Sequence, residues 1–159
     1  MAKLDLDAIQ RRVASLTNVA DPSAVLKTQP GAVFEIPDDL VRFPSDPRRT
    51  WHEARRVIVV QAHGLLGPVQ PDTVSIVPCS ASQKGARRGD FLIPEGEGAF
   101  TKPNVVAYAT LLMPVLKKAL TGDGYRGKLS DETYGQLLAI ISANLGLGSA
   151  LGLSGAGSR

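Results

Sequence analysis

Short apolar runs rich in β-branched residues are the sequence feature that most restricts the fold. The run Arg56–Gln61 reads RVIVVQ and the run Thr73–Pro78 reads TVSIVP, and the turn-rich link HGLLGPVQPD separates them. Runs of this length and composition are typical of strands, and the link predicts that the two strands pair with each other. The chain is therefore expected to fold around a small sheet.

Three further runs extend this prediction to five strands. They are AVFEI (Ala32–Ile36), DFLIP (Asp90–Pro94) and the longer apolar stretch Val105–Val115, which Pro114 should terminate or bulge. Between Pro37 and Ala54 lies a proline-rich stretch that predicts a long loop. Five short strands joined by such connections predict a small antiparallel β-barrel of the SH3-like type.

Two helices are predicted at the ends of this barrel. Apolar residues recur at helical spacing between Leu4 and Leu16. In KLSDETYGQLLAIISANLGLG, Ser130 is the expected N-cap, with acidic residues in the first turn and a hydrophobic staple between Leu129 and Tyr134. The predicted buried stripe of this second helix is Leu137, Leu138, Ile141 and Leu145. The fold class is thus mainly β with flanking N-terminal and C-terminal α-helices (α+β).

A chain of 159 residues is long enough for one domain with a core. Residues 1–29 are expected to form the N-terminal helix and a connection, and residues 30–147 the barrel with its closing helix. Residues 148–159 are rich in Gly and Ser and are expected to be disordered.

Positive charge is concentrated in the segment that contains the strands. The segment from Arg48 to Arg88 contains seven Arg and Lys residues and two acidic residues. Its net charge is +5, while the whole chain carries +3. A basic segment beside an acidic remainder favours an anionic partner such as nucleic acid, although a solvated surface has the same composition.

Other classes of protein find little support in the sequence. Cys79 is the only cysteine, so no internal disulfide can form, and no stretch approaches the roughly 20 apolar residues that span a bilayer. The N-terminus lacks the apolar core of a signal peptide, which favours the cytoplasm. No residues stand at metal-ligand spacing and no phosphate-binding GxxxxGK[ST] loop occurs, so no metal or other cofactor is expected.

The order of these motifs resembles the MazF/PemK family of toxin endoribonucleases. A strand beginning Arg-Arg-Val-Ile-Val-Val is followed by one ending Val-Pro-Cys-Ser, a basic loop, a short strand with GEG, an apolar strand and a closing LSDET helix. The similarity covers about residues 30 to 147 and lies in the pattern of elements rather than in identity.

The resemblance implies a toxin of a toxin-antitoxin system that cleaves single-stranded RNA, such as mRNA, without a metal. In that reaction the ribose 2′-OH attacks the adjacent phosphate and leaves a cyclic phosphate and a 5′-hydroxyl. The family also implies a homodimer and an antitoxin protein whose acidic tail occupies the RNA groove. No cofactor and no membrane are involved.

Arg55 and Ser80 are the catalytic residues that the resemblance implies. Arg55 matches the arginine that opens the family strand, and Ser80 stands at the Thr or Ser position of the family's Pro-Ile-Thr-Ser-like turn. A permanently charged guanidinium and a hydroxyl suit a phosphate whose negative charge grows in the transition state. The alternatives are a strand-end Arg paired with a carboxylate and a turn Ser bonded to its own backbone.

Six further residues are predicted to contact RNA. Trp51 and His52 precede the strand, where the indole ring could stack a base or cover an edge of the barrel. His52 could also form an acid and base pair with His63, although His63 opens a Gly-rich turn and is more typical of a surface residue. The remaining predicted contacts, which could equally be solubilising surface residues, are Arg56, Lys84, Arg87 and Arg88.

The sequence departs from the family in the apolar stretch, which reads AYATLLMP where relatives carry an acidic residue or Gln and then an Arg. Ala109, Thr110 and Leu112 supply no charge there. A catalytically degenerate module of the same fold, binding nucleic acid or a protein partner, is therefore the alternative function. A third interpretation is a structural role, with both ends of the chain serving assembly.

Overall fold

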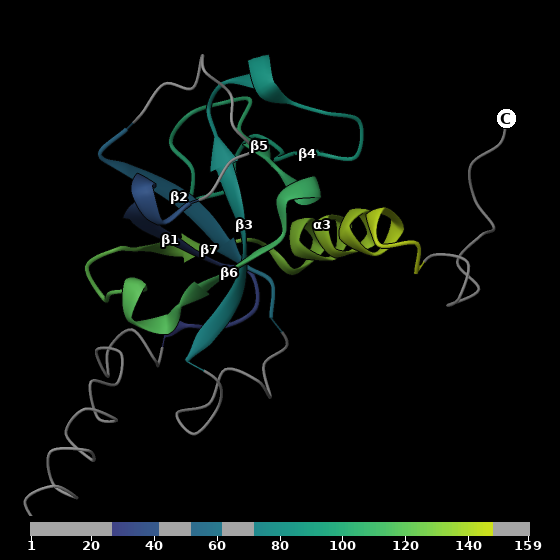
Figure 1. Cartoon of the computed structure of the whole chain (residues 1–159). Coiled ribbons are helices and arrows are strands. Elements are labelled where there is room, and N and C mark those ends of the chain that lie inside the picture. Colours follow the sequence, from purple (N-terminus) through teal and green to yellow (C-terminus); the bar gives the residue numbers. More distant parts are fainter. Residues whose placement is uncertain (1–26, 42–51, 62–71, 148–159) are drawn as a thin grey trace, which may run out of the picture.

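The computed structural model describes residues 27–41, 52–61 and 72–147. Within these ranges, strands and short 3-10 helices (η) are followed by one α-helix (Figure 1). In chain order the elements are β1 (Ala32–Pro37), η1 (Asp38–Leu40), β2 (Ala54–Val59), β3 (Thr73–Ser80), η3 (Gln83–Gly85), β4 (Phe91–Leu92), β5 (Val106–Ala107), η4 (Ala109–Leu111), β6 (Met113–Leu116), η5 (Lys117–Ala119), β7 (Tyr125–Lys128) and α3 (Asp131–Asn144).

The strands form a curled antiparallel sheet in the order β4-β5-β3-β2-β1-β7, with β6 also paired to β3. The long strand β3 pairs along one edge with β2. Along its other edge it pairs first with β6, through residues 73–76, and then with β5, through Cys79 and Ser80. This path ends at β4 and β7, so the curled sheet forms a half-barrel, where the sequence predicted a small SH3-like antiparallel barrel.

Both faces of the sheet are buried, because successive side chains of a strand point to opposite faces. Phe34, Val57 and Ile76 belong to one apolar cluster, which Val41 and Leu120 cover from the connecting segments. The opposite cluster contains Val33, Ile58, Val77 and Cys79 from the sheet and Leu137 and Ile141 from α3. The helix thus covers one face of the sheet.

The helix α3 begins as predicted. Ser130 is its N-cap and accepts a hydrogen bond from the Thr133 backbone N–H. Leu137 and Ile141 are buried, but the prediction was wrong for Leu138 and Leu145, which are 37% and 57% exposed. Leu138 directly follows the buried Leu137, and the 100° step per residue turns its side chain away from the sheet.

The predicted continuous strand Val105–Val115 is two short strands, β5 and β6, separated by η4. The chain turns because the Tyr108 backbone N–H bonds the Pro78 carbonyl and the Asp90 carboxylate accepts from both the Thr110 N–H and its hydroxyl. Pro114 neither terminates nor bulges the second piece: it lies inside β6, which pairs on one side only and so tolerates a residue without an N–H.

The strand β7 was not predicted, because its four residues YRGK contain no apolar run. It pairs with β1 across a register shift, and Gly127 adopts a φ of +130° there, a conformation that other residues avoid. The predicted N-terminal helix lies outside the described residues. In the part of the chain that the structure does describe, no helix is both long and apolar enough to cross a membrane.

Candidate functional site

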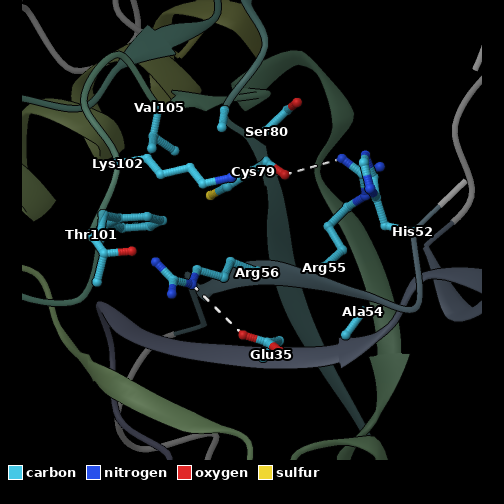
Figure 2. A pocket seen from close by; sticks show the side chains of 12 residues that line it. Glu35, His52, Ala54, Arg55, Arg56, Cys79, Ser80, Thr101, Lys102 and Val105 are labelled. Carbon is cyan, nitrogen blue, oxygen red and sulfur yellow. Dashed lines mark hydrogen bonds and ion pairs between the residues drawn. The ribbon is translucent and has the colours of Figure 1, made fainter. Parts of the chain in front are cut away.

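A cavity of about 240 Å³ opens where β2 begins and β3 ends (Figure 2). His52 and Arg55 lie on one side of this view, and Thr101 and Lys102 lie opposite them. The lining residues are Glu35, His52, Ala54, Arg55, Arg56, Cys79, Ser80, Ala81, Phe100, Thr101, Lys102 and Val105. Four of the residues predicted from the sequence, namely Arg55, Ser80, His52 and Arg56, therefore meet in one place.

Arg55 is held at this cavity by a buried ion pair with Asp38. The Arg55 Nε lies 2.5 Å from Asp38 Oδ1, and the two side chains are 7% and 1% exposed. The Nη2 also donates to Asp38 Oδ2 at 3.5 Å, and Nη1 donates to the Cys79 carbonyl at 3.2 Å. The guanidinium is thus tied to η1 on one side and to β3 on the other.

The register of β1 and β2 explains why Asp38 and Arg55 meet. Pro37, the last residue of β1, pairs with Ala54, the first residue of β2, so η1 begins beside the start of β2. The Asp38 carboxylate also accepts a hydrogen bond from the backbone N–H of His52 at 3.0 Å. Asp38 therefore fixes both the Arg55 side chain and the backbone just before β2.

Arg56 is half-buried on the neighbouring wall of the cavity. Its Nε lies 3.8 Å from Glu35 Oε2, its cross-strand partner, and its Nη1 donates to the Ala99 carbonyl at 3.1 Å. Its guanidinium carbon lies 5.7 Å from the centre of the Phe100 ring. The Glu35 carboxylate also binds Arg126 at 3.1 Å, so one acid partly neutralises two arginines.

Ser80 is the last residue of β3, and its Oγ accepts a hydrogen bond from the Ser82 N–H at 3.1 Å. This is the turn bond that the alternative interpretation of Ser80 predicted, but the hydroxyl proton remains available to a ligand, because a hydroxyl both accepts and donates. The preceding Cys79 is a core residue, as expected. Burial raises the pKa of the Cys79 thiol well above its ordinary value, and the charges of Arg55 and Arg56 offset only part of that increase.

The opposite wall contributes residues that sequence reasoning missed. Phe100, Thr101 and Lys102 come from the connection between β4 and β5, and none of the three was predicted as a site residue. The signal was present as an aromatic ring, a hydroxyl and a cation in direct succession before Pro103. Thr101 and Lys102 are both exposed and add a second hydroxyl and a third cation to the cavity.

Two other predicted RNA contacts, Arg87 and Arg88, do not line this cavity. Arg87 and Arg88 are exposed in the segment between η3 and β4, which contacts the end of α3 through a bond from Asn144 to the Gly89 carbonyl. The Lys84 backbone lies in η3. Trp51 and His63 fall outside the described residues.

The cavity is electrostatically suited to an anion that also accepts hydrogen bonds. Arg55, Arg56 and Lys102 supply positive charge, and Ser80 and Thr101 supply hydroxyls. Arg geometry matches a phosphate better than a single ammonium does. Among the described residues, no group of three or more His, Cys, Asp and Glu side chains is placed to hold a metal ion.

Comparisons with known proteins bear on the fold. No family model and no curated protein matches the sequence. An "Endoribonuclease from Mycobacterial species" matches 76% of this chain and 93% of its own length, with a TM-score of 0.55 and 13% identity. An endoribonuclease "in complex with its cognate antitoxin", also mycobacterial, matches 76% of this chain and 95% of its own, with a TM-score of 0.53 and 13% identity.

A MazE-MazF structure from Deinococcus radiodurans gives the same result, with a TM-score of 0.54 and 11% identity over 76% of this chain and 96% of the other. The chain thus has the fold of the MazF endoribonuclease toxins. The resemblance seen in the order of the sequence motifs is confirmed at the level of the fold.

Proposed function

We propose that this protein is an endoribonuclease toxin that cleaves single-stranded RNA without a metal. Support comes above all from the cavity in a MazF-like half-barrel, which gathers three cations and two hydroxyls where β2 begins and β3 ends. Such a set suits a phosphodiester, whose negative charge grows as the ribose 2′-OH attacks the phosphorus. The expected products carry a cyclic phosphate and a 5′-hydroxyl.

In this proposal Arg55 and Ser80 act at the reacting phosphate. The contacts of Arg55 with Asp38 and the Cys79 carbonyl hold its guanidinium in one orientation, which reduces the reorganisation needed when charge develops. Ser80 donates its hydroxyl proton to a phosphate oxygen. Arg56 and Lys102 neutralise the flanking backbone, and the Phe100 ring beside Arg56 offers a surface on which a base can stack.

The proposed partners are single-stranded RNA, a second copy of the chain and an antitoxin protein. Two of the solved structures with this fold contain an antitoxin, as their descriptions state. The cluster of Arg55, Arg56 and Lys102 would attract an acidic segment of such a protein as well as RNA.

One observation favours the alternative of a binding module without catalysis. Arg55 is buried and paired with Asp38, an arrangement that also suits a purely structural arginine. In that case the cavity would bind the RNA backbone through Arg56 and Lys102 and leave the strand intact.

Incubation of the purified chain with a mixed-sequence single-stranded RNA in EDTA, followed by analysis of the product ends, tests the proposal. We expect cyclic-phosphate ends and a loss of about 100-fold in rate for Ser80→Ala, because one transition-state donor is removed. Lys102→Ala should weaken binding and lower the salt slope by about 1, whereas Lys118→Ala, a matched exposed lysine of η5, should change neither. Bound but intact RNA would support the binding module instead.

A further inference from the structure

We infer that His52 is the general base that accepts the 2′-OH proton in this reaction. The inference rests on the proposed function and adds a catalytic residue to it. His52 lines the same cavity as Arg55 and Ser80, and its side chain is exposed at the rim.

The backbone of His52 is fixed relative to the phosphate-binding cation. Asp38 accepts from the His52 N–H through Oδ2 at 3.0 Å and from Arg55 Nε through Oδ1 at 2.5 Å. A single buried carboxylate therefore sets the distance between the chain at His52 and the guanidinium of Arg55. The His52 side chain lies on the same side of the cavity as Arg55, the group that would hold the phosphate (Figure 2).

Few other side chains of the cavity can accept a proton near neutral pH. Arginine and lysine are charged and have no acceptor, and hydroxyls of serine and threonine are weak bases. The Cys79 thiol is buried and bonds the Val77 carbonyl. Among the described residues, the charged and titratable groups around His52 are Glu35 of β1, Asp38 of η1, Glu53, Arg55 and Arg56 at the start of β2, Cys79 of β3 and Lys102 of the β4–β5 connection.

Glu35 is the competing base, but two guanidinium groups occupy its carboxylate. Arg126 Nε lies 3.1 Å and Arg56 Nε 3.8 Å from the same Oε2. Histidine, by contrast, is the side chain that most often takes or gives a proton in general acid–base catalysis.

The step balances as follows. A ring nitrogen of His52 takes the 2′-OH proton while the 2′-oxygen forms a bond to phosphorus, and the bond from phosphorus to the 5′-oxygen breaks. The departing 5′-oxygen takes a proton from water, and the hydroxide so formed neutralises the imidazolium. The products are the cyclic phosphate and a 5′-hydroxyl, with His52 regenerated.

The test is the pH dependence of single-turnover RNA cleavage between pH 5 and 9, with folding of each variant checked by circular dichroism. The wild type should lose rate at acidic pH as imidazole protonates. His52→Gln should cleave RNA 100-fold to 10,000-fold more slowly, which is roughly the rate contribution of a general base. Its rate should also lack the fall at acidic pH, which is the acidic limb of the pH profile. Added imidazole should partly restore His52→Ala but leave the wild type unchanged.

Matched variants separate the possible outcomes. His63→Gln removes the other histidine and Glu35→Gln removes the competing base, and both should keep the acidic limb. If His52→Gln keeps the limb, or if either control variant loses it instead, the assignment of His52 is wrong while RNA cleavage stands. If the wild type does not cleave RNA, the proposed function and this inference fail together.

Discussion

The buried ion pair between Asp38 and Arg55 leads to the strongest prediction about stability. Asp38 is 1% exposed, and its carboxylate accepts hydrogen bonds from the Arg55 guanidinium and from the His52 backbone N–H. Asp38→Ala removes the carboxylate that contacts the buried guanidinium of Arg55, and breaking a buried ion pair by removing one partner typically costs about 3–5 kcal/mol. For a chain of this size, that loss corresponds to a fall in Tm on the order of 10–15 °C.

Urea denaturation followed by circular dichroism measures this effect, and a second substitution tests its cause. Removing the charge of Arg55 as well, in Asp38→Ala/Arg55→Met, eliminates the buried cation and should recover at least about half of the lost stability. Asp131→Ala serves as the control, because its pair with Lys128 at 3.0 Å is exposed and should contribute less than about 1 kcal/mol. Additive losses in the double variant, or an Asp38→Ala loss no larger than that of Asp131→Ala, would refute the reasoning.

Three further predictions concern α3 and its contacts with the sheet. Leu137→Ala should cost about 2–5 kcal/mol in the free energy of unfolding, whereas Leu138→Ala, one position along and 37% exposed, should cost far less. Equal shifts of the urea midpoint for the two variants would contradict the assignment of Leu137 to the buried face of α3. Ser130→Ala removes the N-cap and should cost about 1 kcal/mol, measured in the same way. Desolvation raises the pKa of Glu97, but hydrogen bonds from Ser130 and Thr133 outweigh this effect and hold the pKa below its ordinary value of 4.5. The ionised Glu97 carboxylate should therefore stabilise the fold above about pH 4.5. That stabilisation should be lost as the pH falls through the lower pKa of the folded protein. The difference in the free energy of unfolding between the wild type and Glu97→Gln should therefore shrink from pH 6 to pH 3. A constant difference would contradict the lowered pKa of Glu97.

The strands that sequence reasoning predicted share one property, which is a short and mainly apolar run. AVFEI and TVSIVP became β1 and β3 nearly as predicted, because each buries side chains on both faces of the sheet. The errors arose where tertiary hydrogen bonds decide the backbone. The break after β5 depends on Asp90, which is 20 residues away from Thr110 in the sequence, and β7 exists because β1 offers it a free edge.

The candidate site was predicted in part, mainly where its residues lie in or beside strands that the sequence also predicts. Arg55 and Ser80 sit at strand ends, where the order of the motifs is informative, and the pairing of β2 with β3 brings them together. Asp38 and Lys102 were missed because each belongs to a connection whose course only the folded chain defines. A local pattern of residues does not reveal that Asp38 packs against the start of β2, 17 residues later.

The position of Asp38 affects how any loss of activity is to be interpreted. Its carboxylate stabilises the sheet end and also orients Arg55 and the backbone of His52, so substitutions of Asp38 or Arg55 change stability and site geometry together. Loss of cleavage in such variants does not by itself identify a catalytic group. Ser80 and Lys102 are more informative, because the Ser80 hydroxyl makes one turn contact and Lys102 is exposed, so their removal leaves the buried ion pair intact. A large rate loss in Ser80→Ala with unchanged stability would therefore locate the chemistry in this cavity more securely than any Arg55 variant.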